Sequence, residues 1–342
     1  MKYYLGKFLT GMVILLWIIS LFAQSPDTLK TKTSYWTKTY GGKFSDVGYS
    51  VQQTSDNGYV IAGVSNSFGP GLCDVYIIKT DREGDTIWTK TYGGKKSDFA
   101  FSVQQTSDGG YVVAGFTWSF AEGFRDVYII KIDSSGRIIW TKTYGGKFSD
   151  VGYSIQQTFD GGYIVVGSTF SFGKGDYDLY LIKTNEKGDT LWTKTYGGTG
   201  DDFGRSIQQT FDSGYIVTGY TNSFGEGDQD VYLIKADVDG DTVWTKTYGG
   251  AKTDESFSVQ QTLAGGYIIA GWTASFGEGD FDTYIIETDA NGDVLWTRVL
   301  GGQDQERATS VQLTVDRGYI ITGYTKSFGR GIADVYLIKI KP

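Results

Sequence analysis

The side chains that could do chemistry in this sequence are carboxylates, because histidine is absent and Cys73 is the single cysteine. These absences exclude a histidine-based catalytic triad, a zinc site built from histidines or several cysteines, and an intrachain disulfide. Glu255, Glu287 and Glu306 stand where other copies of a repeated unit carry a different residue. A glycosidase needs two carboxylates about 5–10 Å apart. A carboxylate-dependent glycoside hydrolase is therefore one hypothesis, but no spacing pairs these acids, and we predict no catalytic residue.

A second acidic feature could bind a metal ion. Asp237, Asp239 and Asp241 place three carboxylates within five residues, and calcium takes six to eight oxygen ligands. The same positions also form an ordinary Asp-x-x-Gly hairpin turn, and Arg137 replaces the last acid of that turn in another copy. We therefore predict a turn without a metal or other cofactor, and calcium is the weaker alternative.

After its first 35 residues the chain consists of six copies of one repeated unit of 52 residues. Its tryptophans recur at this spacing without insertion or deletion: Trp36, Trp88, Trp140, Trp192, Trp244 and Trp296. A period of this length is typical of solenoids, propellers and related arrays.

Each unit reads as four short strands rich in β-branched and aromatic residues and bounded by Gly and Asp clusters. In the second copy they are Thr86–Tyr92, Phe101–Thr106, Tyr111–Thr117 and Val127–Lys131. The pattern predicts an all-β fold over residues 36–342, a six-bladed β-propeller of four-stranded antiparallel blades. We expect Trp36–Thr54 and Tyr319–Ile340 to share one blade, which would close the ring and hide both sheet edges. An open β-solenoid is the alternative.

Particular motifs of the unit are similar to those of a known family. The run Trp192–Gly198, the following Asp202, the strand 214–221 and the run 230–235 resemble the SBBP β-propeller repeats of exported bacterial proteins. The resemblance covers residues 36–342. It implies a propeller and transfers no catalytic residue, and the family is named for seven blades where this chain has six copies.

The first residues look like a targeting signal. Lys2 and Lys7 precede the apolar run 12–22, and Ala23 is a small residue at the expected cleavage point. We predict a signal peptide over residues 1–23, an N-terminal leader over 24–35, a secreted or periplasmic protein, and no membrane span after cleavage. The net charge of −8 argues against binding of nucleic acid. We expect a monomer.

Polar residues that recur in every copy have a structural interpretation. In all six copies one position within a strand is serine, and the residue just before another strand is aspartate. Six equivalent polar groups suit hydrogen bonds within and between blades better than they suit a single reaction centre. The aspartates are Asp74, Asp126, Asp178, Asp230, Asp282 and Asp334, and the serines are Ser50, Ser102, Ser154, Ser206, Ser258 and Ser310.

Differences between the copies carry the functional prediction. They concentrate in two longer connections, Gly-Gly-x-x-x-Asp and Ser-Phe-Gly-x-Gly-x-x-Asp, which strand order places on one mouth of the propeller. Binding residues favour loops held by a rigid scaffold, although exposed loops also drift neutrally. The candidate ligand-binding residues are Trp118, Phe124, Arg125, Phe170, Tyr177, Tyr220, Trp272 and Phe281. We predict a non-catalytic extracytoplasmic binding or scaffold propeller with a protein or glycan ligand, and a glycan-binding propeller is a more specific alternative.

Overall fold

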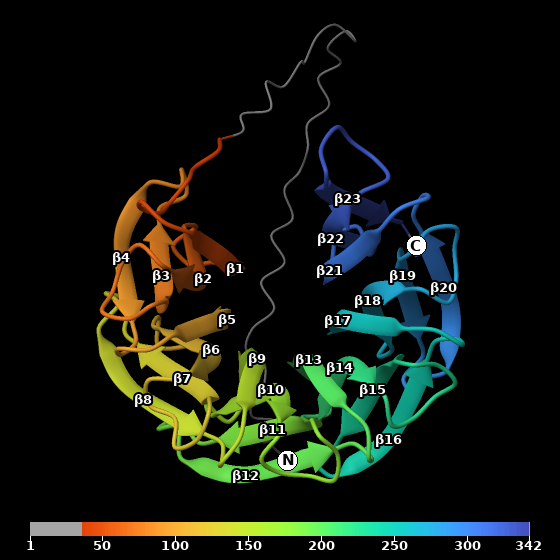
Figure 1. Cartoon of the computed structure of the whole chain (residues 1–342), viewed down its shortest axis with the longest axis horizontal. Coiled ribbons are helices and arrows are strands. Elements are labelled where there is room, and N and C mark those ends of the chain that lie inside the picture. The colour runs from red at the N-terminus through yellow and green to blue at the C-terminus, as the bar shows by residue number, and fades with distance from the viewer. Residues whose placement is uncertain (1–35, 342) are drawn as a thin grey trace, which may run out of the picture. The chain divides into compact units, whose positions relative to one another are not determined.

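The computed structural model describes residues 36–341, and the chain from Thr37 onward forms one compact unit. Six antiparallel sheets follow one another around a central axis, each with its first strand innermost (Figure 1). Five sheets have four strands and the last has three. This arrangement confirms the all-β six-bladed propeller. The described residues contain no helix that could cross a membrane, and the predicted signal peptide and leader lie outside them.

The six sheets are called blades 1 to 6 in chain order. Blade 1 is β1 (Asp46–Gln53), β2 (Tyr59–Ser65), β3 (Asp74–Thr80) and β4 (Thr86–Tyr92); blade 2 is β5 (Asp98–Gln105), β6 (Tyr111–Thr117), β7 (Asp126–Ile132) and β8 (Ile138–Tyr144); blade 3 is β9 (Asp150–Gln157), β10 (Tyr163–Thr169), β11 (Asp178–Thr184) and β12 (Thr190–Tyr196). Blade 4 is β13 (Asp202–Gln209), β14 (Tyr215–Thr221), β15 (Asp230–Ala236) and β16 (Thr242–Tyr248); blade 5 is β17 (Asp254–Gln261), β18 (Tyr267–Thr273), β19 (Asp282–Thr288) and β20 (Val294–Leu300); blade 6 is β21 (Glu306–Leu313), β22 (Tyr319–Thr325) and β23 (Asp334–Ile340).

The core lies between neighbouring blades. Val60 and Ile77 of blade 1, for example, belong to one buried cluster with Val113 and Tyr128 of blade 2. The middle strands are therefore apolar on both faces, because each face is covered by another sheet. Burial of each such aliphatic side chain contributes about 1.5–3 kcal/mol.

Tight turns set the register of the inner hairpins. Gly109 has a φ of 79°, a left-handed conformation that glycine adopts without steric cost. Asp108 accepts a hydrogen bond from the Gly110 backbone N–H in the same turn. A bulge between Ala100 and Ser102 shifts the pairing register between β5 and β6, and such a bulge bends the strand that contains it.

The predicted sharing of one blade by the two ends of the chain is not confirmed. β1 pairs with β2 in blade 1 rather than with blade 6, because the short turn between them makes a local hairpin. β23 pairs with β22, and the sheet of blade 6 has three strands in the described residues. Val335 and Leu337 on β23 are consequently 84 % and 65 % exposed, whereas the equivalent Val231 and Leu233 of blade 4 are buried.

Candidate functional site

The inner strands of all six blades enclose two cavities along the central axis. The strand registers place the two longer connections of every blade at one end, which we call the long-loop mouth. The opposite end carries the short turns and is called the short-turn mouth. Nearer the long-loop mouth lies the aromatic cavity, of about 620 Å³, and nearer the short-turn mouth lies the glutamine cavity, of about 310 Å³.

One position of each inner strand faces the aromatic cavity and differs between blades. It lies immediately before the recurrent serine, and its residues are Tyr49, Phe101, Tyr153, Arg205, Phe257 and Thr309. The sequence prediction missed these residues because it looked for variation in loops rather than in strands. The signal was present, since an aromatic position becomes arginine in one copy and threonine in another.

Arg205 lies among aromatic rings from three blades. Its guanidinium carbon is 4.4 Å from the ring centroid of Tyr153 and 5.5 Å from those of Phe203, Tyr220 and Phe257. Such cation–π contacts are worth about 0.5–2 kcal/mol each. The Nε atom of Arg205 is buried and has no hydrogen-bond partner among residues 36–341. The rings and a hydrogen bond to Tyr220 thus hold the side chain in place, while its Nε atom makes no hydrogen bond.

A second arginine is held in the same manner in blade 6. The guanidinium carbon of Arg307 lies 4.4 Å from the ring of Trp272 and 4.7 Å from that of Phe281, both in blade 5. The rings of Trp272 and Phe281 pack edge to face with centroids 4.4 Å apart. The Nε atom of Arg307 is also buried without a partner in the part of the chain that the structure describes.

Glu255 lies within electrostatic range of both arginines. It pairs with Trp272 across β17 and β18. Burial raises the pKa of Glu255 above its usual range, although Arg205, Arg307 and the Trp272 indole act in the opposite direction. Residues that break the repeat in blades 4, 5 and 6 therefore form one charged group at the long-loop mouth.

The sequence-predicted aromatic residues fall into separate groups. Phe170 packs on Tyr177 with centroids 5.1 Å apart, and Tyr177 lies 5.1 Å from Phe203, which also stacks on Tyr220. These residues extend the aromatic surroundings of Arg205. Trp272 and Phe281 belong to the surroundings of Arg307.

The remaining three candidates lie in blade 2. The guanidinium carbon of Arg125 is 5.1 Å from the ring of Phe116 and 5.9 Å from that of Trp118, and the two rings are 5.0 Å apart. Phe124 is 66 % exposed beside them. Blade 2 thus carries an aromatic and cationic cluster of its own, formed by other residues than those around Arg205.

Two of the unusual acids have framework roles. Glu306 accepts hydrogen bonds from the Thr325 hydroxyl and the Gly302 backbone N–H, both at 2.6 Å. Asp98 bonds the equivalent Thr117 and Gly94 in blade 2. A hydrogen bond between Glu287 and Tyr319 contributes to the raised pKa of that tyrosine, after burial as the larger cause. These contacts account for both glutamates without a catalytic carboxylate pair.

The acidic run of blade 4 forms the expected turn. The backbone N–H groups of Asp239 and Asp241 donate to the Asp237 carboxylate at 3.0 and 2.8 Å. Asp241 also pairs with Lys194 at 2.6 Å. Within residues 36–341 no cluster of acids is arranged around a common metal position.

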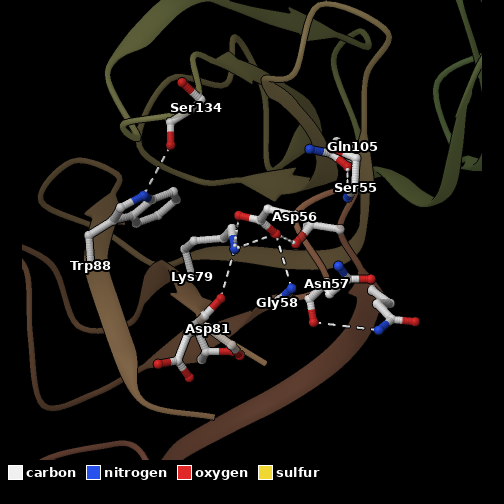
Figure 2. A network of polar contacts seen from close by, with 12 residues as sticks. Ser55, Asp56, Asn57, Gly58, Lys79, Asp81, Trp88, Gln105 and Ser134 are labelled. Atoms are coloured by element: carbon white, nitrogen blue, oxygen red, sulfur yellow. Dashed lines mark hydrogen bonds and ion pairs between the residues drawn. The ribbon is translucent and has the colours of Figure 1, made fainter. Parts of the chain in front are cut away.

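Recurrent polar residues join strands and blades, as predicted. Ser50 accepts a hydrogen bond from the Val103 backbone N–H of the next blade at 3.2 Å. At the short-turn mouth, Figure 2 shows Lys79 bonded to Asp56, which also accepts the Gly58 N–H, and Ser55 bonded to Gln105 of blade 2.

Comparisons with known proteins agree with the fold. The family model described as outer membrane protein assembly factor BamB matches residues 74–302. The regulatory protein FlaEY of Caulobacter vibrioides is 25 % identical over an alignment 175 residues long, which covers 44 % of this chain and 18 % of that protein.

Solved structures of other proteins match this chain at low sequence identity. The Pan2 WD40 domain of Neurospora crassa has a TM-score of 0.50 at 11 % identity, covering 85 % of this chain and 88 % of that one. A protein of unknown function from Bacteroides caccae has a TM-score of 0.46 at 14 % identity, covering 77 % and 82 %.

Proposed function

This chain belongs to the family of outer membrane protein assembly factor BamB, and on that premise we propose that it is a non-catalytic extracytoplasmic propeller that binds a ligand at its long-loop mouth. The observation that carries the proposal is the convergence of Arg205, Glu255 and Arg307 from three successive blades. Residues that recur in all blades maintain the ring, so residues that depart from the repeat at one place are the ones free to recognise something.

The two arginines favour binding over a purely structural role. A buried polar atom without a partner costs roughly 1–3 kcal/mol, and most such atoms in proteins are satisfied. Among residues 36–341 three guanidinium Nε atoms remain unsatisfied, those of Arg125, Arg205 and Arg307, and the last two belong to the charged group around Glu255. A hydrogen-bond acceptor there would remove this cost, which the tyrosine or phenylalanine at the Arg205 position of blades 1, 2, 3 and 5 does not bear.

A glycan is the more specific candidate for this ligand. Aromatic rings and serine hydroxyls line the aromatic cavity together, with Tyr49, Phe101 and Ser102 as examples. Rings offer flat apolar faces and hydroxyls offer hydrogen bonds, and pockets with this combination bind small molecules of matching shape. A protein ligand is the second candidate, since the name of the family concerns protein assembly.

The proposal is tested by screening the exported protein on immobilised glycans and peptides, with variants that copy residues from other blades. Arg205→Tyr introduces the tyrosine of blades 1 and 3, and Phe211→Ser introduces at the short-turn mouth the serine of blades 1 and 2. We expect Arg205→Tyr to lower the affinity for any ligand that the screen finds and Phe211→Ser to leave that affinity unchanged. Equal loss in both variants, or unchanged binding in both, would refute binding at the long-loop mouth.

Export and oligomeric state form part of the same proposal. Residues 1–23 have the composition of a signal peptide. Fractionation and intact mass should place the protein outside the cytoplasm with residues 1–23 removed, and light scattering should give the mass of a monomer. Recovery of the uncleaved chain from the cytoplasm would contradict the extracytoplasmic part of the proposal.

A further inference from the structure

Glutamine side chains fix the polarity of the cavity nearest the short-turn mouth. Gln52 accepts a hydrogen bond from the backbone N–H of Gln105 in the next blade, at 2.6 Å, and Gln104 accepts one from Gln157 at the same distance. The contact repeats with Gln156, Gln208 and Gln260. Because a backbone N–H only donates, the bonded atom must be Oε1, so the Nε2 donors remain for the cavity.

Serine side chains likewise leave hydrogen-bond donors free in the aromatic cavity. Ser50, Ser102 and Ser206 each accept a backbone N–H from the following blade at 3.2 to 3.3 Å. Each hydroxyl hydrogen is therefore available to another acceptor. The central axis is thus lined by an excess of donors, and the residues lining the two cavities include no carboxylate within the described chain.

An aromatic belt surrounds these donors and contains one cation. Tyr49 packs on Phe101 with centroids 5.3 Å apart, and Phe101 packs on Tyr153 at 5.4 Å. Arg205 continues the belt between Tyr153 and Phe257. Among the described residues that line the aromatic cavity, Arg205 is the only charged one.

We infer that the aromatic cavity binds an acidic saccharide, with the carboxylate of a uronic acid residue at Arg205 and its hydroxyl oxygens at the serine donors that line this cavity. The inference rests on the proposed function and names the ligand class for it. Three features of the site carry it: Arg205 as the one charged residue among the described residues that line the cavity, the surplus of serine donors, and a cavity of about 620 Å³. This volume lies within the usual range for small-molecule sites, about 300–1,000 Å³.

An acidic saccharide fits these features better than a neutral one. Its carboxylate only accepts hydrogen bonds and can take two from one guanidinium, which is the geometry that arginine favours. A neutral sugar would add no negative charge to that of Glu255, which lies within electrostatic range of both Arg205 and Arg307. The chain itself has a net charge of −8, so long-range attraction of an anion is weak and the contact must be local.

The test is calorimetric titration of the exported full chain with trigalacturonate and with neutral galactotriose at low salt. We expect trigalacturonate to bind and galactotriose to bind at least about tenfold more weakly. Arg205→Tyr should weaken trigalacturonate binding by about 10- to 100-fold, the factor that corresponds to losing a charge-assisted hydrogen bond. Arg137→Ala removes the same charge at an exposed turn and should change binding less than twofold.

The outcomes separate this inference from the proposed function. Equal binding of both saccharides, or trigalacturonate binding that survives Arg205→Tyr, overturns the acidic-saccharide inference while mouth binding stands. Absence of binding by either saccharide also overturns it, and the glycan and peptide screen then decides whether the mouth binds another ligand. Circular dichroism of Arg205→Tyr establishes that the variant is folded, as the tyrosines of blades 1 and 3 lead us to expect.

Discussion

Removal of Asp108 should destabilise the propeller because it leaves a buried lysine without its counter-ion. Lys131 is 3 % exposed, and its Nζ lies 2.9 Å from the nearer carboxylate oxygen of Asp108. Burial by itself would raise the pKa of Asp108, but hydrogen bonds from Thr106 and Lys131 outweigh it and hold the pKa below its usual range. In the Asp108→Ala variant, Lys131 keeps contacts only to the Thr106 hydroxyl at 3.0 Å and the Ile132 carbonyl at 3.3 Å.

The magnitude follows from the burial of the two partners. An uncompensated buried charge costs about 3–5 kcal/mol. The Asp108 side chain is 55 % exposed, so solvent already screens part of the interaction, and Lys131 keeps two oxygen partners. We therefore expect Asp108→Ala to lower the free energy of unfolding by about 2–3 kcal/mol. This corresponds to a Tm lower by about 4–6 °C in a domain of this size.

Blade 5 supplies the second half of the experiment. There the aspartate is replaced by Ala264 and the lysine by Glu287, so both members of the pair differ together within one chain. Asp108→Ala combined with Lys131→Met should recover most of the lost stability, because no buried charge then lacks a partner. The coupling free energy between the two sites should be about 1–2 kcal/mol.

Thermal and urea unfolding, followed by tryptophan fluorescence, measure these differences. Arg137→Ala is the matched control, since the Arg137 side chain is exposed and its ion pair with Asp133 should affect stability far less than the buried pair does. A loss below about 0.5 kcal/mol in Asp108→Ala, or a double variant no more stable than the single one, would refute the assignment of Lys131 as a buried charge that depends on its partner.

Three other predictions concern pH and the ends of the chain. Burial raises the pKa of Glu255 in the folded state, so the wild type should lose stability as the pH rises from the unfolded-state pKa of Glu255 to its folded-state pKa. Glu255→Gln should therefore be more stable than the wild type at pH 7 and equally stable at pH 3, which thermal melts at both pH values will test. Burial raises the pKa of Tyr128, Tyr180 and Tyr232 to about 12, so the unfolded chain ionises first and the protein should unfold cooperatively between about pH 10 and 12; tyrosines that titrate near pH 10 with near-UV circular dichroism retained would contradict this. If residues 36–40 pair with β23 as β4 pairs with β3, then Lys38 lies opposite Leu337. The double variant Lys38→Cys and Leu337→Cys, made in a Cys73→Ser background, should then form a disulfide that intact mass detects. A protein that stays fully reduced under oxidising conditions would count against that pairing.

The fold could be predicted from the sequence because its repeat is exact in length. Every 52 residues the same turn glycines and strand residues return, so a prediction for one blade holds for all. Gly109 and Asp108 mark the inner turn in the sequence as clearly as in the structure. Closure of the ring depends instead on contacts between residues almost 300 positions apart. Local sequence patterns contain no information about such contacts.

The candidate site was predictable only in part. Tyr220, Trp272 and Phe281 were found because they depart from the repeat at or beside loops. Arg205 was missed because it lies inside a strand, where its neighbours Ser206 and Gln208 follow the repeat closely. That Glu255 lies near arginines of both adjacent blades depends on how inner strands approach one another at the axis, and spacing along the chain does not determine that approach.

The N-terminal segment gives a physical reason to expect that the ring closes. Lys38 pairs with Asp85 at 2.5 Å, and the Tyr40 hydroxyl donates to the Gly84 carbonyl at 2.6 Å. Outer strands make the same two contacts to the following blade elsewhere, for example Lys142 to Asp189 and Tyr144 to Gly188. Residues 38–40 therefore occupy the position of an outer strand preceding blade 1, and no strand within residues 36–341 pairs with them. The edge strand β23 offers such a partner, and pairing would cover Val335 and Leu337. Because Leu337 and Thr322 of blade 6 also line the aromatic cavity, closure would leave that cavity open chiefly along the central axis.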